Sequence, residues 1–244
     1  MFSPMKYRIT LFAIITLSLY HFSTHILPGQ PSRLSVKSVT ETLQKGKVLR
    51  TTADIYFDPA TGRIINMTHS PEEYISIATP EGKTDIYYPS KNSRVSVQNL
   101  ALSSRNNNLW FFLNNESYDM GLQGMGFTVD GIRQEENYTI TTWQAPLRAL
   151  AEVDKIDLVH ENHIPIYIEY RDTKKMTTLK VYYEDYLRVD KWMLPARVTE
   201  IIFTSRKDSV IRRSTYTDFR FGENADPKGF DFTIPADAEL LKTK

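Results

Sequence analysis

Residues 54–97 read DIYFDPATGRIINMTHSPEEYISIATPEGKTDIYYPSKNSRVSV, and this pattern is the clearest indication of the fold. Short runs rich in β-branched and aromatic residues alternate in it with breaks that contain Pro, Gly, Asp or Asn. Pro fixes φ and lacks a backbone N–H, Gly adopts positive φ, and Asp and Asn bond their own backbone, so each break predicts a turn. The expected strands are residues 54–57, 63–69, 74–78, 84–88 and 94–98.

The connections between these strands are only a few residues long. Parallel neighbours need a crossover of a dozen or more residues, usually a helix, and these connections have no room for one. Consecutive strands must therefore pair antiparallel, which predicts a meander.

Strand-like runs continue on both sides of this meander, at residues 36–43, 48–57, 138–143, 155–160, 164–171, 177–186, 195–203 and 210–221. One segment, residues 103–116, is helical in pattern, because Leu109, Phe112 and Leu113 recur at helical spacing. Glycines at 121, 124, 126 and 131 predict an irregular stretch after it. The expected class is all-β with minor helix.

Composition excludes several kinds of function. The chain has 244 residues, 30 basic against 29 acidic, and a formal net charge of +1, with no basic stripe that would favour nucleic acid. It has no Cys, which excludes disulfides, thiolate zinc sites, a Cys nucleophile and a lipid-modified N-terminal Cys. No Pro- or Ser-rich linker divides the chain, so we expect one domain over residues 32–244.

The N-terminus has the pattern of a secretory signal. Lys6 and Arg8 precede the apolar residues 9–20, a run shorter than the ~20 residues of a membrane span. We expect a signal peptide at residues 1–23, with Ser23 and Gly29 as candidate cleavage positions; the alternative is an uncleaved membrane anchor. Export of a chain without Cys fits the bacterial periplasm.

Several motifs resemble the periplasmic lipoprotein carrier (LolA-like) family. They are Phe57-Asp58-Pro59, Ser70-Pro71, Glu81-Gly82-Lys83, Ile86-Tyr87-Tyr88-Pro89 and, near the C-terminus, Phe230-Asp231-Phe232-Thr233-Ile234-Pro235. The resemblance in strand order covers nearly all of the chain after Ser35. It implies a curved antiparallel sheet, an incomplete barrel, with one main helix over the open side. The alternative is a closed β-sandwich that its own side chains pack.

The resemblance also implies a function without catalysis or cofactor. Such a carrier binds the acyl chains of acylated lipoproteins, receives them from an inner-membrane lipoprotein-release transporter, passes them to an outer-membrane receptor, and acts as a monomer. This chain departs from the family in two places. It has hardly any room for a helix before residue 36, and Asp58 stands where the family keeps an Arg, so the family's gating is not transferable; Arg63 is a candidate substitute.

The expected lipid-binding pocket combines strand and helix residues. Apolar side chains that alternate with polar ones should share the concave face. In the strand at 63–69 this choice is ambiguous, because Ile64 precedes Ile65 and a slip of one residue reverses the faces. The expected pocket residues are Ile55, Phe57, Ile65, Met67, Ile75, Ile77, Ile86, Tyr88, Leu109, Trp110, Phe112 and Leu113. The helix should be displaced when cargo enters; alternatively, Trp110 and Phe111 pack under the glycine-rich stretch.

Other constellations predict no site. His160-Glu161-Asn162-His163 is the one histidine cluster, and we interpret it as a solvated turn rather than a metal or catalytic site. Ser and His lack a G-x-S-x-G context. The alternatives to a carrier are a lipid-binding or envelope-stress sensor domain on the same scaffold, an exported hydrolase, and a structural envelope protein.

Overall fold

The computed structural model describes residues 32–147, 153–205 and 208–241. The expected signal peptide at residues 1–23 lies outside the described residues. The strands are β1 (Leu34–Gln44), β2 (Lys47–Asp58), β3 (Arg63–Ser70), β4 (Tyr74–Ala78), β5 (Lys83–Tyr88), β6 (Ser93–Gln98), β7 (Thr128–Glu135), β8 (Tyr138–Gln144), β9 (Lys155–Glu161), β10 (Ile164–Arg171), β11 (Thr177–Val189), β12 (Trp192–Ser205), β13 (Asp208–Phe221) and β14 (Glu239–Leu240). The helices are α1 (Asn108–Leu113) and the 3₁₀ turns η1 (Pro89–Lys91), η2 (Leu100–Leu102), η3 (Ser104–Asn106), η5 (Gly222–Asn224) and η6 (Pro227–Gly229).

Within the described residues, all fourteen strands form one sheet, in the order β14-β6-β5-β4-β3-β2-β1-β13-β12-β11-β10-β9-β8-β7. Neighbours pair antiparallel, apart from the parallel contact of β14 with β6. The predicted meander is confirmed as β2 to β6, and a second meander runs from β7 to β13. β1 lies between them, paired with β2 on one side and β13 on the other.

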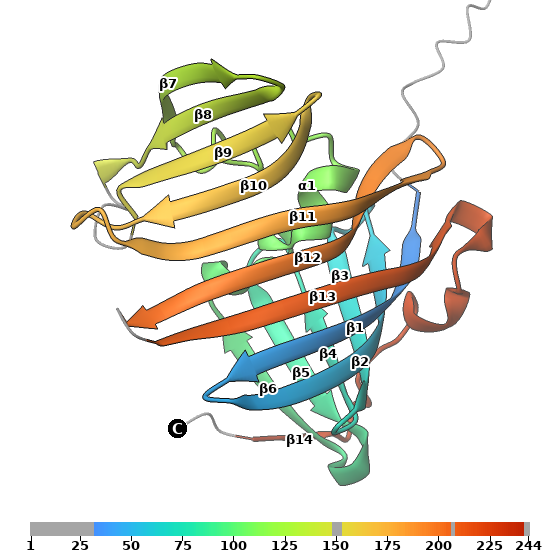
Figure 1. The fold of residues 1–244 in the computed structure, drawn as a ribbon. Coiled ribbons are helices and arrows are strands. Elements are labelled where there is room, and N and C mark those ends of the chain that lie inside the picture. Colours follow the sequence, from blue (N-terminus) through green and yellow to red (C-terminus); the bar gives the residue numbers. More distant parts are fainter. Residues whose placement is uncertain (1–31, 148–152, 206–207, 242–244) are drawn as a thin grey trace, which may run out of the picture.

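The sheet curves around α1 without closing into a barrel, so α1 lies on its concave face (Figure 1). This inner face carries the larger hydrophobic core, which we call the inner core. Phe57 and Ile64 from the first meander and Leu158 and Val198 from the second belong to this one core. Leu109, Phe112 and Leu113 of α1 are buried in this core. The all-β class and the incomplete barrel with one main helix are confirmed.

The predicted helix over residues 103–116 is much shorter than expected. Asn107 separates η3 from α1 with an extended backbone (φ −78°, ψ 137°). Its side-chain oxygen accepts the N–H of Leu109 at 2.9 Å and so caps the N-terminus of α1. Asn114 ends the helix after six residues. The Asn residues act here as caps rather than as interior helix positions, because their side chains compete for the backbone.

The glycine-rich stretch is only partly irregular. Residues 114–126 form turns, but β7 begins at Thr128 and pairs with β8 through a bulge between Val129 and Gly131. Nearly every side chain of β7 is exposed, so the strand has no apolar alternation that would have predicted it.

A second core, the outer core, lies on the convex face of the first meander. Residues 222–241 cross this face, and Phe230 and Ala238 pack there against Tyr56, Ile65 and Ile77. Gly229 makes the close approach possible, because a Cβ at this position would lie 2.3 Å from the Tyr56 ring.

Among the described residues, no helix has the length and apolar character to cross a membrane.

Candidate functional site

The twelve expected pocket residues do not share one face. Directly opposed residues of antiparallel strands point to the same side of a sheet. In the strand register, Phe57 is the partner of Ile64. Ile55 is the partner of Asn66, which in turn pairs with Ser76, and Ser76 pairs with Ile86 on the next strand. Ile55 and Phe57 belong to the inner core, so Ile86, and Tyr88 two residues further along the same strand, lie on the inner face.

Four expected pocket residues lie on the opposite face. Ile65, Ile75 and Ile77 are buried in the outer core, and Met67 packs against it. The expectation that they face the concave side with α1 is therefore wrong. The physical reason is that both faces of β3 are covered, the inner one by the inner core and the outer one by residues 222–241, so both Ile64 and Ile65 are buried.

The segment that leads into α1 is fastened to two turns of the first meander. Ser104 Oγ donates to the Gly62 carbonyl at 2.6 Å, and Ser103 Oγ donates to the Pro80 carbonyl at 2.7 Å. Trp110 lies edge-on to Phe57, and a Cβ at Gly62 would be 3.3 Å from its ring. This end of the helix is thus held by the β2–β3 and β4–β5 connections.

The other contacts of α1 reach the second meander. The Phe112 ring packs edge-on against Tyr183 and Tyr186 of β11, with ring centroids 5.6 and 6.0 Å away. The Tyr183 hydroxyl donates to Asn108 Oδ1 at 3.0 Å, and burial raises the pKa of Tyr183 well above its ordinary value. The helix therefore bridges the two halves of the curved sheet.

A cleft of about 570 Å³ borders α1 on the side of Trp110 and Phe111. Its apolar lining includes Leu100 and Met125, and Arg105 and Glu116 add charge. The pKa of Glu116 is raised by burial and by Asp119, while Arg105 opposes this shift. The volume lies in the range of 300–1,000 Å³ that is typical of small-molecule sites.

Phe111 and Trp110 differ in their packing. Phe111 lies under the glycine-rich stretch, where a Cβ at Gly121 would be 2.6 Å from its ring, as the alternative interpretation expected. Trp110 instead packs edge-on against Phe57 of the first meander, and the Arg105 guanidinium lies 5.9 Å from its ring centroid. Sequence reasoning missed Leu100 and Met125, whose position in turns offers no periodic signal.

The histidine cluster is not a solvated turn throughout. His163 is exposed in the β9–β10 turn, but His160 belongs to β9 and is only 8% exposed. Its Nε2 lies 3.4 Å from the Ser117 carbonyl, and burial lowers its pKa. The residues described contain no group of three or more His, Cys, Asp or Glu side chains that could hold a metal ion.

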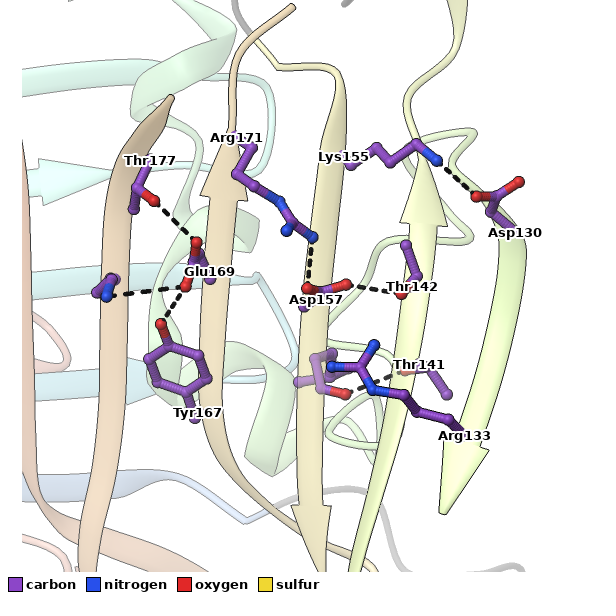
Figure 2. A network of polar contacts seen from close by, with 12 residues as sticks. Asp130, Arg133, Thr141, Thr142, Lys155, Asp157, Tyr167, Glu169, Arg171 and Thr177 are labelled. Atoms are coloured by element: carbon purple, nitrogen blue, oxygen red, sulfur yellow. Dashed lines mark hydrogen bonds and ion pairs between the residues drawn. The ribbon is translucent and has the colours of Figure 1, made fainter. Parts of the chain in front are cut away.

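A ladder of paired charges covers the outer face of β8 to β11 (Figure 2). Asp157 accepts from Arg171 and, at 2.7 Å, from Thr142. Glu169 accepts from Tyr167 and, at 2.8 Å, from Thr177. Both carboxylates are thus engaged by neighbouring strands, an arrangement that ties the sheet together.

Comparison with known proteins gives information on the fold. No family model matches the sequence, and neither does any curated protein sequence. Solved structures do match. One of them is a LolA superfamily protein from Nitrosomonas europaea, with 10% identity, a TM-score of 0.55 and coverage of 82% of this chain and 90% of that one. The fold is LolA-like.

Two further structures share the LolA-like fold. A putative outer membrane lipoprotein-sorting protein domain from Vibrio parahaemolyticus has 11% identity, a TM-score of 0.55 and coverage of 84% of this chain and 91% of that one. A DUF1329 family protein from Desulfovibrio piger has 10% identity, a TM-score of 0.54 and coverage of 80% and 88%. The resemblance first visible in the sequence motifs is thereby confirmed at the level of fold.

Proposed function

We propose that this protein is a periplasmic carrier that binds the acyl chains of lipoproteins and moves them from the inner to the outer membrane, without catalysing a reaction. The observation that carries the proposal is the LolA-like sheet wrapped around α1 (Figure 1), with Trp110 and Phe111 lining a partly apolar cleft. An inner-membrane lipoprotein-release transporter would load the protein, and an outer-membrane receptor would unload it. It would act as a monomer.

The physical need for such a carrier is large. Burial of apolar groups is worth ~0.8 kcal/mol per CH₂, so exposure of one chain of about sixteen carbons to water costs on the order of 10 kcal/mol. A carrier needs an apolar concave surface and a cover that opens. The α1 segment suits this role, because six helical residues are too few to be stable alone and depend on tertiary contacts.

The proposal is tested with a triacylated lipoprotein and the same protein without its acyl chains. Each is incubated with the purified carrier, and complexes are separated by size-exclusion chromatography. We expect a soluble 1:1 complex with the acylated form alone. Equal binding of both forms, or cleavage of the lipoprotein, would contradict a role as an acyl-chain carrier.

A further inference from the structure

An apolar row crosses the outer face of the sheet outside the outer core. Val48, Leu43, Ile211 and Ile201 are successive cross-strand partners on β2, β1, β13 and β12. Directly opposed residues lie on the same face of a sheet. This face is the outer one, because Leu43 lies on the same side of β1 as Ser35, and Ser35 is the partner of the outer-core residue Tyr56. Val48 is 65% exposed and Leu43 38%, although both are large and apolar.

Cations surround this row. Lys45 and Lys47 lie at the β1–β2 turn, and Arg50 and Arg213 flank the row on the outer face, one on each side of Glu41. Among the residues that the structure describes, none of these four cations has an ion-pair partner. A basic rim around exposed apolar side chains complements a surface that is negatively charged at its boundary and apolar beneath.

A cleft of about 580 Å³ lies at the same end of the sheet as the apolar row. Met176 and Phe203 form part of its apolar lining, and Lys174 adds an ammonium group. The ammonium of Lys180 also lines the cleft and lies 3.8 Å from Glu169 Oε2. Lys180 is also the cross-strand partner of Ile201, so the cleft adjoins the apolar row. Asp172 lines the cleft too, but its Oδ1 already accepts the backbone N–H groups of Lys174 and Met176 at 2.9 Å. Ammonium groups beside apolar side chains suit a phospholipid headgroup and the start of its chains.

We propose that this hairpin surface, formed by the apolar row and its four cations, docks the protein on a bilayer that contains anionic phospholipids. The β1–β2 and β10–β11 connections lie at this end of the sheet, so one flat surface can meet them together (Figure 1). Apolar side chains at the β1–β2 hairpin enter the interface, and the cations bind lipid phosphates. The site is separate from the cleft beside α1.

Because the chain contains no Cys, one dye can be placed at one chosen position of the full chain. We would label Val48→Cys with an environment-sensitive fluorophore and add vesicles of phosphatidylcholine with or without phosphatidylglycerol. The matched control is Leu187→Cys, which is 46% exposed near the β11–β12 turn, at the other end of β11 from the β10–β11 connection. The dye at position 48 should shift to the blue with the anionic vesicles alone, and the dye at position 187 should not respond.

Charge removal provides the second arm. Adding Lys45→Gln and Lys47→Gln to the labelled protein should raise the lipid needed for a half-maximal shift by about 30-fold, since each cation near an anionic surface contributes about fivefold. Acyl-chain binding beside α1 should not change in this variant, so the two proposals can fail separately. The proposal is overturned if position 48 does not respond, if position 187 responds equally, or if the dye at 48 is already in an apolar setting without lipid, as a second copy or another segment of the chain would produce.

Discussion

The indole ring of Trp110 lies edge-on to the phenyl ring of Phe57, with 5.5 Å between their centroids and 88° between their planes. This pair joins the short helix to the strand that begins the predicted meander. Edge-to-face aromatic pairs add about 0.5–1.5 kcal/mol beyond the burial of their area. The position of α1 over the sheet therefore depends on this contact.

Phe57→Ala should destabilise the protein by about 3–5 kcal/mol, because it leaves a cavity in the inner core and removes the partner of Trp110. Denaturant unfolding measures this change. The matched control is Phe203→Ala, an exposed Phe on β12, which should change stability by about 0.5 kcal/mol or less. Equal losses in the two variants would show that Phe57 does not hold the core together.

Asn107→Ala should loosen α1, because it removes the side-chain acceptor of the Leu109 N–H. We expect a loss of about 1 kcal/mol and faster amide exchange within residues 108–113. Asn107→Asp keeps an acceptor and should restore slow exchange. If both variants exchange alike, the cap is not what begins the helix.

Gly229→Ala should detach residues 222–241 from the outer face, since the added methyl would collide with the Tyr56 ring. Overpacking of this kind costs about 1–3 kcal/mol. Limited trypsin digestion after Lys228 should accelerate. Gly131→Ala is the control, because a Cβ there meets nothing within 4 Å, and it should leave digestion unchanged. Unchanged digestion of the Gly229 variant would mean that this close approach does not exist in solution.

His160 should make stability depend on pH. Burial lowers its pKa in the folded state, so the unfolded chain binds more protons between that value and the ordinary value of 6.5. The contribution of His160 to the free energy of unfolding is fully present above pH 6.5. It is lost as the pH falls through the pKa of His160 in the folded state. Urea unfolding between pH 5 and 8 measures the slope.

His160→Gln should flatten this slope. His163→Asn should keep most of it, because burial is the largest cause of the shift and the charge of His163 is a lesser one. A slope that survives in His160→Gln and disappears in His163→Asn would reverse the assignment.

The antiparallel meander could be predicted from the sequence, because Pro, Gly, Asp and Asn at its breaks determine turns locally. The position of the helix was also predictable from the spacing of Leu109, Phe112 and Leu113. Its length was not, because the backbone of Asn107 is extended and its side chain caps the following turn. β7 escaped prediction, since an exposed edge strand needs no apolar alternation.

The division of the pocket residues between two faces could not be read from local patterns. Ile75 and Ile77 alternate with polar residues as a single buried face requires, but what buries them is Phe230 and Ala238, about 150 residues later in the chain. Alternation shows that a face is covered, and it does not show which element covers it. The cleft residues Leu100 and Met125 likewise come together through turns whose paths depend on tertiary contacts.

Quenching of tryptophan emission by a brominated acyl peptide tests whether an acyl chain binds beside Trp110. Trp110 is half-buried at the cleft, whereas Trp143 and Trp192 are buried in the inner core. The brominated acyl chain should quench the emission of the unmodified protein at saturation, and the Trp110→Phe variant should bind the same peptide with little quenching. Absence of acyl-dependent binding, or equal quenching in both proteins, would contradict acyl-chain binding beside Trp110.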